Sequence, residues 1–305
     1  MKYDIRKLSV LQKHSLEKKI EISLNLITDF YEKTNGRIAV SFSGGKDSTV
    51  LLHLVRSLYP ETIGVFANTG LEYPEIVSFV KKQKNIHFVR PLKSYFQVVK
   101  EFGWPLLSKN ISRTVYNLQH NPTQKQIENA FGDGTDRIPE KFRWIVDSDI
   151  KLSDKCCFYM KEEPMDRFYK ENNLYPIIGT MAIESRRRAL AWASGGCNVI
   201  NDKIKKSKPL SIWIEKDIWE YIRINKLEIS DAYKWYNRTG CMYCGYGIHL
   251  DKFPNKFNML KLTHPKHHDL IMNKKGLGEV LKKMKIHYSE KANKQLNIDF
   301  KEFRD

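Results

Sequence analysis

The sequence lacks an apolar run long enough to cross a membrane, and its first residues lack the apolar core of a signal peptide. Acidic residues are outnumbered, with 35 Asp and Glu against 52 Lys and Arg in 305 residues. These absences predict a soluble, cytoplasmic protein that does not bind a membrane. The formal charge of +17 predicts attraction for anions, with nucleic acid as the leading candidate, although an AT-rich genome rich in lysine codons would give the same composition.

Cysteine is scarce, which makes its spacing informative. Five cysteines in a cytoplasmic protein are expected to bind metal or act in catalysis rather than form disulfides. Cys156 and Cys157 are adjacent, and Cys241 and Cys244 form a CxxC, with 83 residues between the two pairs. Adjacent side chains diverge, so they suit separate iron corners of a [4Fe–4S] cluster better than one tetrahedral Zn²⁺. Zinc and unligated buried thiols are the alternatives.

Cys197 lies outside this set of four and follows two glycines. A thiol in such a setting can relay sulfur as a persulfide if enough of it is thiolate. The alternative is a structural thiol at the end of a helix.

The most specific motif is Ser43-Gly44-Gly45-Lys46-Asp47-Ser48, which stands between an apolar, strand-like run and an amphipathic, helix-like one. Two glycines allow a tight turn whose N–H groups face an anion at the start of a helix. An ordinary surface turn capping a helix is the alternative. The string differs from the GxxxxGK[ST] loop and resembles the SGGxDS loop of ATP pyrophosphatases, which cleave ATP between the α and β phosphates.

Hydrophobic periodicity predicts an α/β fold with a doubly wound parallel sheet. The expected strands are 37–42, 62–67, 86–90, 175–179 and 198–201, and the expected helices are 14–34, 47–58, 73–84, 123–131 and 184–194. We expect a nucleotide-binding domain over 1–210, with an irregular insertion at 103–150, and a helical C-terminal region over 211–305 that carries the CxxC. The basic run 203–208 is expected to be a solvated loop.

A wider resemblance joins these motifs. Cys156-Cys157, followed by Lys161, Pro164 and the distant CxxC, resembles the cluster-binding pattern of adenylylsulfate reductases in the phosphoadenosine phosphosulfate reductase family. With the stretches 68–75 and 179–188, the similarity spans about residues 36–250. It implies the family's adenine nucleotide alpha hydrolase-like fold.

Two departures point to a particular branch. No cysteine follows Cys244, where such reductases carry an attacking thiol, and Lys46 suits the outer phosphates of ATP. The chain is then similar to the iron–sulfur enzymes of tRNA thiolation and DNA phosphorothioation. That resemblance implies ATP, Mg²⁺, a [4Fe–4S] cluster, DNA or tRNA as acceptor, and a sulfur donor such as a cysteine desulfurase. The alternatives are a reductase that borrows its thiol from elsewhere and a non-enzymatic, nucleotide-sensing protein.

The resemblance assigns individual roles. Ser43, Gly44 and Gly45 would grip pyrophosphate, Lys46 would neutralise it, and Asp47 and Ser48 would position Mg²⁺ or phosphate. Asn68, Thr69 and Gly70 are expected near ribose or adenine. Residues expected to close over the phosphates are Gly179, Glu184, Ser185, Arg186 and Arg188. Those expected to act in catalysis are Lys46, Asp47 and Arg188.

Overall fold

The computed structural model describes residues 4–134, 136–201 and 204–286. Its backbone contacts divide the chain into two compact units, which take in the described parts of 1–95 with 157–241 (unit 1) and of 96–156 with 242–305 (unit 2). The chain passes between the units three times, and two of these passages fall inside the cysteine pairs. The expected domain boundary at residue 210 stays a prediction.

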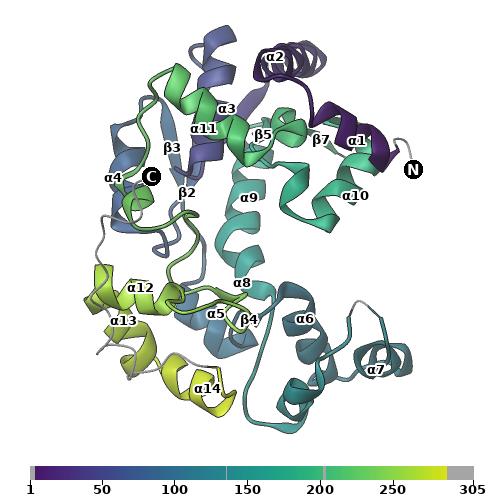
Figure 1. Ribbon diagram of the computed structural model, residues 1–305, viewed down its shortest axis with the longest axis vertical. Coiled ribbons are helices and arrows are strands. Elements are labelled where there is room, and N and C mark those ends of the chain that lie inside the picture. The colour runs from purple at the N-terminus through teal and green to yellow at the C-terminus, as the bar shows by residue number, and fades with distance from the viewer. Residues whose placement is uncertain (1–3, 135, 202–203, 287–305) are drawn as a thin grey trace. The chain divides into compact units, whose positions relative to one another are not determined.

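Unit 1 is built around a six-stranded sheet of order β3-β2-β1-β5-β7-β6. All neighbouring strands are parallel except β6 and β7. The strands are β1 (Ile38–Ser41), β2 (Gly64–Ala67), β3 (Ile86–Val89), β5 (Tyr175–Ile178), β6 (Asn198–Ile200) and β7 (Lys205–Ser207). The helices are α1 (Ile5–Leu11), α2 (Leu16–Lys33), α3 (Lys46–Leu58), α4 (Pro74–Lys82), α9 (Glu163–Glu171), α10 (Arg186–Gly195) and α11 (Glu215–Ile224) (Figure 1).

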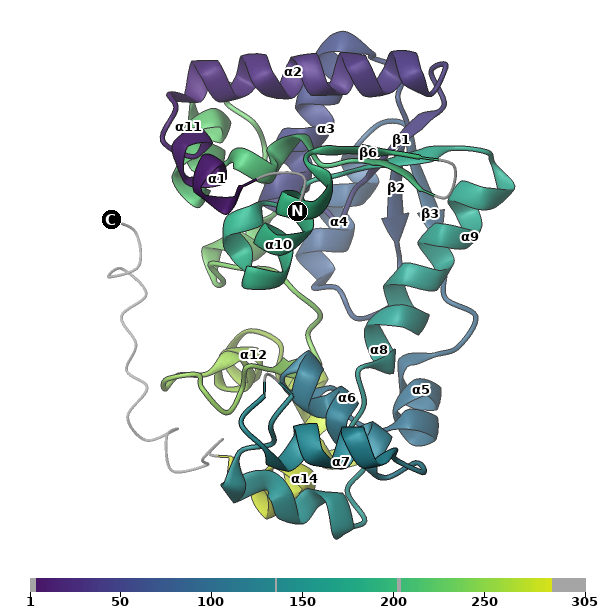
Figure 2. The ribbon, with the colours of Figure 1, turned by 90° about the vertical axis from the view of Figure 1, so that its right-hand side faces the viewer.

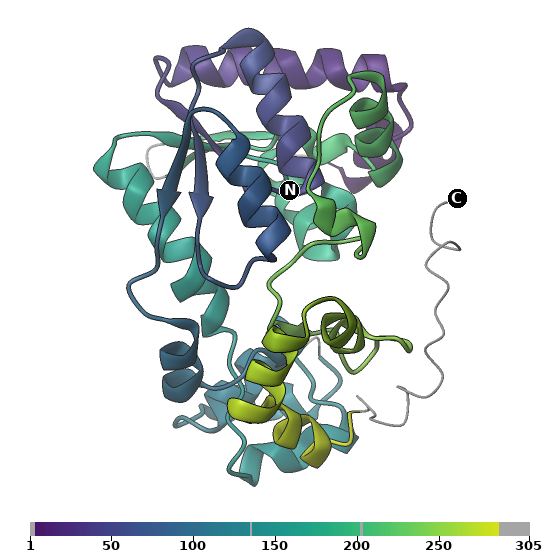
Figure 3. The same ribbon diagram turned by 90° about the vertical axis from the view of Figure 1, so that its left-hand side faces the viewer.

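Helices cover both faces of this sheet. On one face, Ala39, Val65 and Val89 pack against Phe168 and Tyr169 of α9, seen beside the strands in Figure 2. On the other face α3 and α4 cover the strands (Figure 3), and a Cβ on residue 64 of β2 would lie 3.7 Å from Leu52 Cδ1 of α3. The expected doubly wound α/β fold is therefore confirmed.

Helix α11 is held in place by buried polar contacts as well as apolar packing. The Lys19 ammonium of α2 lies 2.6 Å from the Asp217 carboxylate of α11, and both side chains are buried. Just before α11, the Trp213 indole donates to Ser23 Oγ at 2.9 Å. These contacts stabilise the position of α11, which brings Glu215 and Trp219 to the start of α3.

The expected solvated loop at 203–208 is wrong over Lys205–Ser207, which form β7; residue 203 lies outside the described part. The Lys205 ammonium lies 5.1 Å from the centre of the Tyr175 ring, and Ser207 Oγ lies 2.6 Å from Asn198 Oδ1. Long lysine stems cover apolar neighbours while their charges reach solvent, so a basic run can still be a strand.

A π-helical turn, Phe158–Glu162, precedes α9 and was not expected. Pro164 explains it, because proline has no N–H to donate to the carbonyl four residues earlier, and its ring crowds that carbonyl. The Glu163 N–H bonds to the Phe158 carbonyl instead. The widened turn carries Lys161 toward the carboxyl ends of the strands.

Unit 2 is mainly helical. Its short strands β4 (Leu106–Leu107) and β8 (Gly245–Tyr246) pair in parallel and join its two chain segments. The expected helix near 123–131 is α7, whereas α6 was not expected. The helices are α5 (Tyr95–Phe102), α6 (Lys109–Leu118), α7 (Gln124–Phe131), the 3₁₀ helix Glu140–Asp147, α12 (Lys256–Thr263), α13 (Pro265–Asp269) and α14 (Leu277–Lys283), and α8 (Lys155–Cys157) lies across a passage between the units.

Candidate functional site

The motif Ser43–Ser48 forms the turn between β1 and α3. Gly44 has a φ of +71°, and a Cβ on it would lie 2.6 Å from Val80 Cγ2 and 2.8 Å from Ile76 Cγ2. Only glycine therefore fits both the backbone and the space at this position. Ser48 Oγ donates to the Gly45 carbonyl at 2.9 Å, which fixes the shape of the turn.

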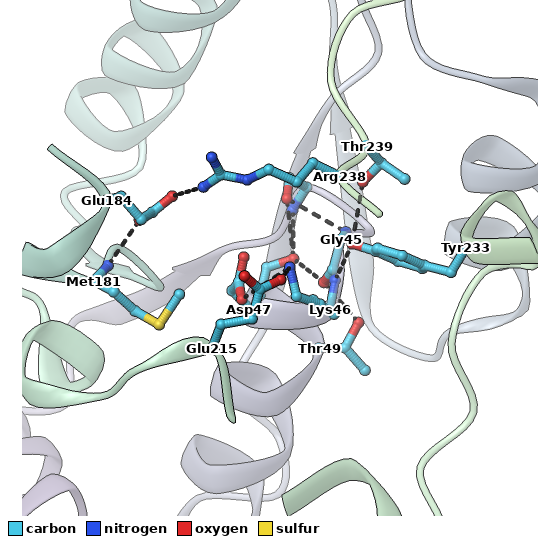
Figure 4. Close-up of polar contacts among 12 residues, drawn as sticks. Gly45, Lys46, Asp47, Thr49, Met181, Glu184, Glu215, Tyr233, Arg238 and Thr239 are labelled. Carbon is cyan, nitrogen blue, oxygen red and sulfur yellow. Dashed lines mark hydrogen bonds and ion pairs between the residues drawn. The ribbon is translucent and has the colours of Figure 1, made fainter. Parts of the chain in front are cut away.

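Several backbone amides that were expected to bind phosphate donate hydrogen bonds to hydroxyl oxygens of the protein. The Ser43 N–H donates to Ser48 Oγ at 3.2 Å, and the Gly45 N–H donates to Ser43 Oγ at 3.4 Å. The Lys46 N–H, the first of α3, donates to the Tyr233 hydroxyl at 2.7 Å (Figure 4). Hydroxyl oxygens thus accept from the amides that the sequence predicted to bind phosphate, and phosphate binding at this turn stays a prediction.

The Lys46 side chain is only 3% exposed and points toward α11. Its ammonium lies 3.2 Å from Glu215 Oε1 and 5.8 Å from the ring centres of both Trp219 and Tyr233. Among the described residues the Glu215 carboxylate of α11 is thus closer to this ammonium than that of Asp47, which is 3.9 Å away. Figure 4 shows the three side chains. Its expected contact with the outer phosphates stays a prediction.

Asp47 occupies the first turn of α3 and faces a cavity. Its Oδ1 is buried and has no hydrogen-bond partner among the described residues. Burial raises the pKa of the Asp47 carboxyl, and the nearby cations Lys46 and Arg238 offset part of that rise. A buried carboxylate oxygen without a donor is suited to a hard cation such as Mg²⁺, which commonly takes one or two carboxylates together with phosphate oxygens.

The turn after β5 approaches the same end of α3. A Cβ on Gly179 would lie 3.2 Å from the Asp47 carbonyl, so glycine permits the approach. Glu184 accepts the Met181 N–H at 3.0 Å and pairs with both Arg188 and Arg238. Burial lowers the pKa of the Arg188 guanidinium without removing its charge in the neutral range.

The stretch after β2 is organised by one carboxylate that the sequence did not single out. Glu72 is buried, and its carboxylate accepts the Thr69 N–H at 3.0 Å and the Thr69 hydroxyl at 2.8 Å. The Lys161 ammonium lies 3.7 Å from Glu72 Oε1. Thr69 therefore holds Glu72, and Glu72 together with Lys161 faces the cavity.

Lys161 also connects this side of unit 1 to two of the cysteines. The Cys241 thiolate, Glu72 and Cys157 together raise the pKa of Lys161 well above its usual range, against the effect of burial. An ammonium beside thiols favours their thiolate form, which is the form that binds metal. Cys157 and Cys241 of unit 1 therefore have the chemistry to bind a metal centre as thiolates. Unit 1 supplies only two of the four predicted cysteine ligands.

The cavity has a volume of about 350 Å³ and lies at the carboxyl ends of β1, β2 and β5. In doubly wound sheets this edge, where the order of strands reverses, is the usual ligand site. Predicted residues that line it are Ser43, Asp47, Ser48, Gly179, Glu184 and Arg188. Predicted residues that do not are Gly44, Gly45, Lys46, Asn68, Thr69, Gly70, Ser185 and Arg186.

Some of the predicted residues that do not line the cavity make structural contacts instead. Ser185 caps α10 by accepting the Arg188 N–H at 3.3 Å, and Asn68 donates its N–H to the Val89 carbonyl at 2.8 Å. Arg186 is exposed. Sequence reasoning missed Glu72, Lys161 and Thr239 as lining residues, although the first two lie within quoted motifs. An acidic residue three positions after Thr69 was the sequence signal that could have identified Glu72 as a site residue.

The cysteines are thiols, and the boundary between the units divides them. Cys157 and Cys241 belong to unit 1, and Cys156 and Cys244 belong to unit 2. In the described ranges no group of three or more histidine, cysteine and acidic side chains is arranged to hold a metal ion. The four-cysteine ligand set stays a prediction.

Cys197 lies in unit 1 but is not among the described residues that line the cavity. Burial raises the pKa of its thiol, and contacts with Trp192 and Ser211 offset part of that rise. A thiol with a raised pKa is a poor nucleophile at neutral pH. The surroundings of Cys197 therefore favour the structural interpretation over the persulfide relay.

Within residues 4–134, 136–201 and 204–286, no helix has the length and apolar character needed to span a bilayer.

Comparisons with known proteins bear on the family. An uncharacterized protein of Methanocaldococcus jannaschii is 26% identical over 259 residues, which cover 81% of this chain and 53% of that protein. An adenosine 5′-phosphosulfate reductase of Staphylococcus epidermidis is 24% identical over 220 residues, which cover 70% of this chain and 72% of that protein. The chain spans about half the length of the first of these relatives.

Among solved structures, the U34-tRNA thiolase NcsA of Methanococcus maripaludis with its [4Fe–4S] cluster is 18% identical. The match covers 88% of this chain and 80% of that chain, with a TM-score of 0.37. At that score neither the cluster nor the tRNA is carried over to this chain. The model of the phosphoadenosine phosphosulfate reductase domain matches residues 37–105 and 108–246, which is more than half of the chain. The chain therefore belongs to the phosphoadenosine phosphosulfate reductase domain family.

Proposed function

We propose that unit 1 binds ATP in its cavity and transfers AMP to an oxygen atom of a nucleic acid, which sulfur then replaces. The acceptor oxygen would attack the α phosphorus, and the bond from that phosphorus to the bridging oxygen would break and release pyrophosphate. A sulfur nucleophile would then displace the adenylated oxygen, which leaves on AMP. The net charge of +17 supports a polyanionic acceptor.

The observation that carries this proposal is Asp47 Oδ1, beside the glycine turn that opens α3. This oxygen is buried, accepts no hydrogen bond from any described residue, and lies 3.9 Å from the Lys46 ammonium. A buried carboxylate is costly unless a cation or donor completes its coordination. Mg²⁺ bound to ATP supplies such a cation. Arg188, whose guanidinium faces the same cavity, would balance charge on the α phosphate as pyrophosphate leaves.

Other residues of the chain act by positioning. Ser43 and Ser48 would give up their mutual contact and turn their hydroxyls toward phosphate oxygens. Gly179 would let the phosphates approach the backbone of α3 closely. Glu184 would hold Arg188 and Arg238 in position and offset their mutual repulsion, because it pairs with both.

A [4Fe–4S] cluster would be held by Cys156, Cys157, Cys241 and Cys244. When bound, it would supply iron–sulfur redox chemistry to the sulfur step, with a cysteine desulfurase as the sulfur donor. Lys161 would stabilise the thiolates of Cys157 and Cys241. Transfer of AMP does not require this group.

Pyrophosphate release is the direct test. We expect the protein to release pyrophosphate from ATP and Mg²⁺ when RNA or DNA is present, and Asp47→Asn to lower the rate at least about a hundredfold, a typical effect for loss of an electrostatic contact in the transition state. Asp29→Asn, on the exposed face of α2, is the matched control. If no nucleic acid stimulates pyrophosphate release, the proposal is wrong, and the result favours a non-enzymatic, nucleotide-sensing protein.

The acceptor is found by comparing cells with and without the protein. Mass spectrometry of their thiolated nucleosides and phosphorothioate dinucleotides would separate tRNA thiolation from DNA phosphorothioation. Loss of a thiolated nucleoside assigns tRNA, and loss of a phosphorothioate dinucleotide assigns DNA.

The cluster has a separate test. Anaerobic purification should give a brown protein that contains iron and acid-labile sulfide, and Cys157→Ser or Cys241→Ser should remove both. Cys197→Ser is the matched control and should keep them. A colourless anaerobic preparation with one zinc ion per chain would contradict the cluster.

A second candidate follows from the relatives that are named adenosine 5′-phosphosulfate reductases. A reductase needs an attacking thiol, and the raised pKa of Cys197 makes that residue poorly suited. Release of sulfite from a sulfonucleotide, abolished by Cys197→Ser, would favour reduction over transfer of AMP.

A further inference from the structure

Unit 2 contains a cavity of about 810 Å³ that the proposed chemistry does not use. It is bordered by the 3₁₀ helix Glu140–Asp147, the segment 248–251 and residues 283–286. Buried apolar side chains form part of its wall, among them Phe142, Ile248 and Met284. Small-molecule sites commonly enclose about 300–1,000 Å³, so a nucleotide fits.

An aromatic face is available at its rim. Trp144 lines the cavity and is 42% exposed, although large aromatic residues are usually well covered. Its indole N–H donates to the Lys141 carbonyl at 3.0 Å, which holds the ring in one orientation. A fixed, exposed indole is suited to stacking against a planar ring.

A polar atom in the wall of the cavity lacks a hydrogen-bond partner among the described residues. His249 Nδ1 is buried and makes no hydrogen bond to any described residue. The ring packs edge-on against Phe142, with 5.7 Å between ring centres, so its orientation is fixed. Burial and Lys141 lower the pKa of His249, with Asp251 acting in the opposite direction, so the ring is neutral at pH 7. A neutral imidazole can bond to the edge of a base.

Positive charge surrounds these two rings. Lys141, Lys283 and Lys285 line the cavity, against one acidic residue, Asp251. Lys283 is paired with Asp149 at 3.2 Å. Over residues 242–286 the chain has nine lysines and three acidic residues. The charge therefore favours a ligand with several phosphates along a strand rather than a neutral molecule.

We propose that this cavity binds one unpaired nucleotide of a single-stranded nucleic acid, with the base stacked on Trp144 and bonded to His249, and the flanking phosphates held by Lys141 and Lys285. The inference deepens the proposed function, because it assigns the nucleic acid to a part of the chain. Its test needs no ATP, so its failure is distinguishable from failure of the proposed chemistry.

The test is fluorescence anisotropy of end-labelled, single-stranded RNA and DNA of about twelve nucleotides, a length typical of stacking sites, with the full chain. We expect Trp144→Ala to weaken binding roughly tenfold, and Trp144→Phe to keep most of it, since stacking contributes that much per base. Lys141→Gln should reduce the dependence of log K on log salt by about 0.7, the value for one phosphate contact on a single strand. Lys125→Gln, exposed on α7 and outside the cavity, is the matched control.

Comparing the affinities for the RNA and the DNA oligonucleotide identifies which polymer the site binds. A preference for either polymer supports the site. Equal affinity of the wild type and Trp144→Ala would overturn the inference. So would weakening by Trp235→Ala alone, because that exposed indole belongs to unit 1. Binding of AMP as tightly as the oligonucleotide would also overturn it, because the cavity would then take a free nucleotide.

Discussion

Gly44 and Gly70 have nearly the same left-handed backbone but very different surroundings. Their φ values are +71° and +75°. A Cβ on Gly44 would overlap Val80 and Ile76, whereas a Cβ on Gly70 would meet no atom within 4 Å. The pair therefore separates the cost of backbone strain from the cost of a clash.

We expect Gly70→Ala to lower the free energy of unfolding by about 1 kcal/mol, the cost of left-handed backbone for a residue with a Cβ. Gly44→Ala should lower it by about 2–4 kcal/mol, because overpacking adds to that strain. Urea unfolding of both variants measures the difference. Equal losses would mean that α4 moves aside at little cost and that the turn is not held by it.

Asp47 illustrates a conflict between stability and function. Because burial raises the pKa of this carboxyl, its charge destabilises the fold at neutral pH. Asp47→Asn should therefore raise the melting temperature by about 1–2 °C while it abolishes pyrophosphate release. Differential scanning fluorimetry, beside the same measurement on Asp29→Asn, checks this. A lower melting temperature would mean that Lys46 and Arg238 outweigh the cost of burial.

At the scale of residues, the sequence predicted those site residues whose positions follow from the order of strands, turns and helices along the chain. Gly179 comes directly after β5, and Asp47 and Ser48 lie at the start of the helix that follows β1, so the sheet delivers them to one edge. The direction of Lys46 was not predictable, because it depends on Glu215, which is far away in the sequence. Glu72 was missed because its partner Lys161 comes from the π-helical turn before α9, which is far away in the sequence.

Tyr233 and Thr239, in the segment between α11 and Cys241, lie against the turn Ser43–Ser48. The Tyr233 hydroxyl accepts the first N–H of α3, and Thr239 Oγ1 lies 3.2 Å from that hydroxyl. A Cβ on Gly45 would lie within 3.4 Å of both side chains. An anion that binds the turn must displace the Tyr233 hydroxyl.

We expect Tyr233→Phe to bind inorganic pyrophosphate roughly two- to tenfold more tightly, because the ligand no longer competes with a hydrogen bond of about 0.5–1.5 kcal/mol. Titration calorimetry measures this affinity. Tyr221→Phe, which removes a hydroxyl that contacts His53 instead, is the matched control. Weaker binding by Tyr233→Phe would mean that the hydroxyl itself donates to the anion.

Elements with strong periodicity were predicted to within a few residues, among them α2, α3 and β1. β7 was missed because its lysines suggest solvent, and only its pairing with β5 and β6 makes it a strand. The π-helical turn before α9 depends on the effect of Pro164 on a neighbouring carbonyl, which hydrophobic patterns do not record.

At the scale of the whole molecule, two histidines of unit 2 should make the fold sensitive to acid. Burial and Lys261 lower the pKa of His268 below its usual 6.5, and Asp269 offsets part of the shift. The pKa of His249 is lowered as well. As the pH falls through 6.5, the unfolded chain takes up these protons before the folded chain does. The free energy of unfolding therefore decreases until the folded pKa is reached.

Urea unfolding at about pH 7 and pH 5.5 tests this sign, since both values lie near the usual histidine pKa. The wild type should be less stable at the lower pH, and His268→Gln together with His249→Gln should reduce the difference. His14→Gln, an exposed residue of unit 1, is the control. A wild type that gains stability on acidification would contradict the expectation.

The three crossings of the chain between its units limit how the protein can be dissected. Removing everything after Cys241 would delete β8 and leave β4 without its strand partner, while residues 96–156 remain attached. A truncation from the C-terminus would therefore unfold the rest of unit 2, and the resulting loss of binding would be mistaken for the removal of a binding site. Point substitutions, or excision of both segments with a short bridge in place of 96–156, would assign functions to each unit correctly.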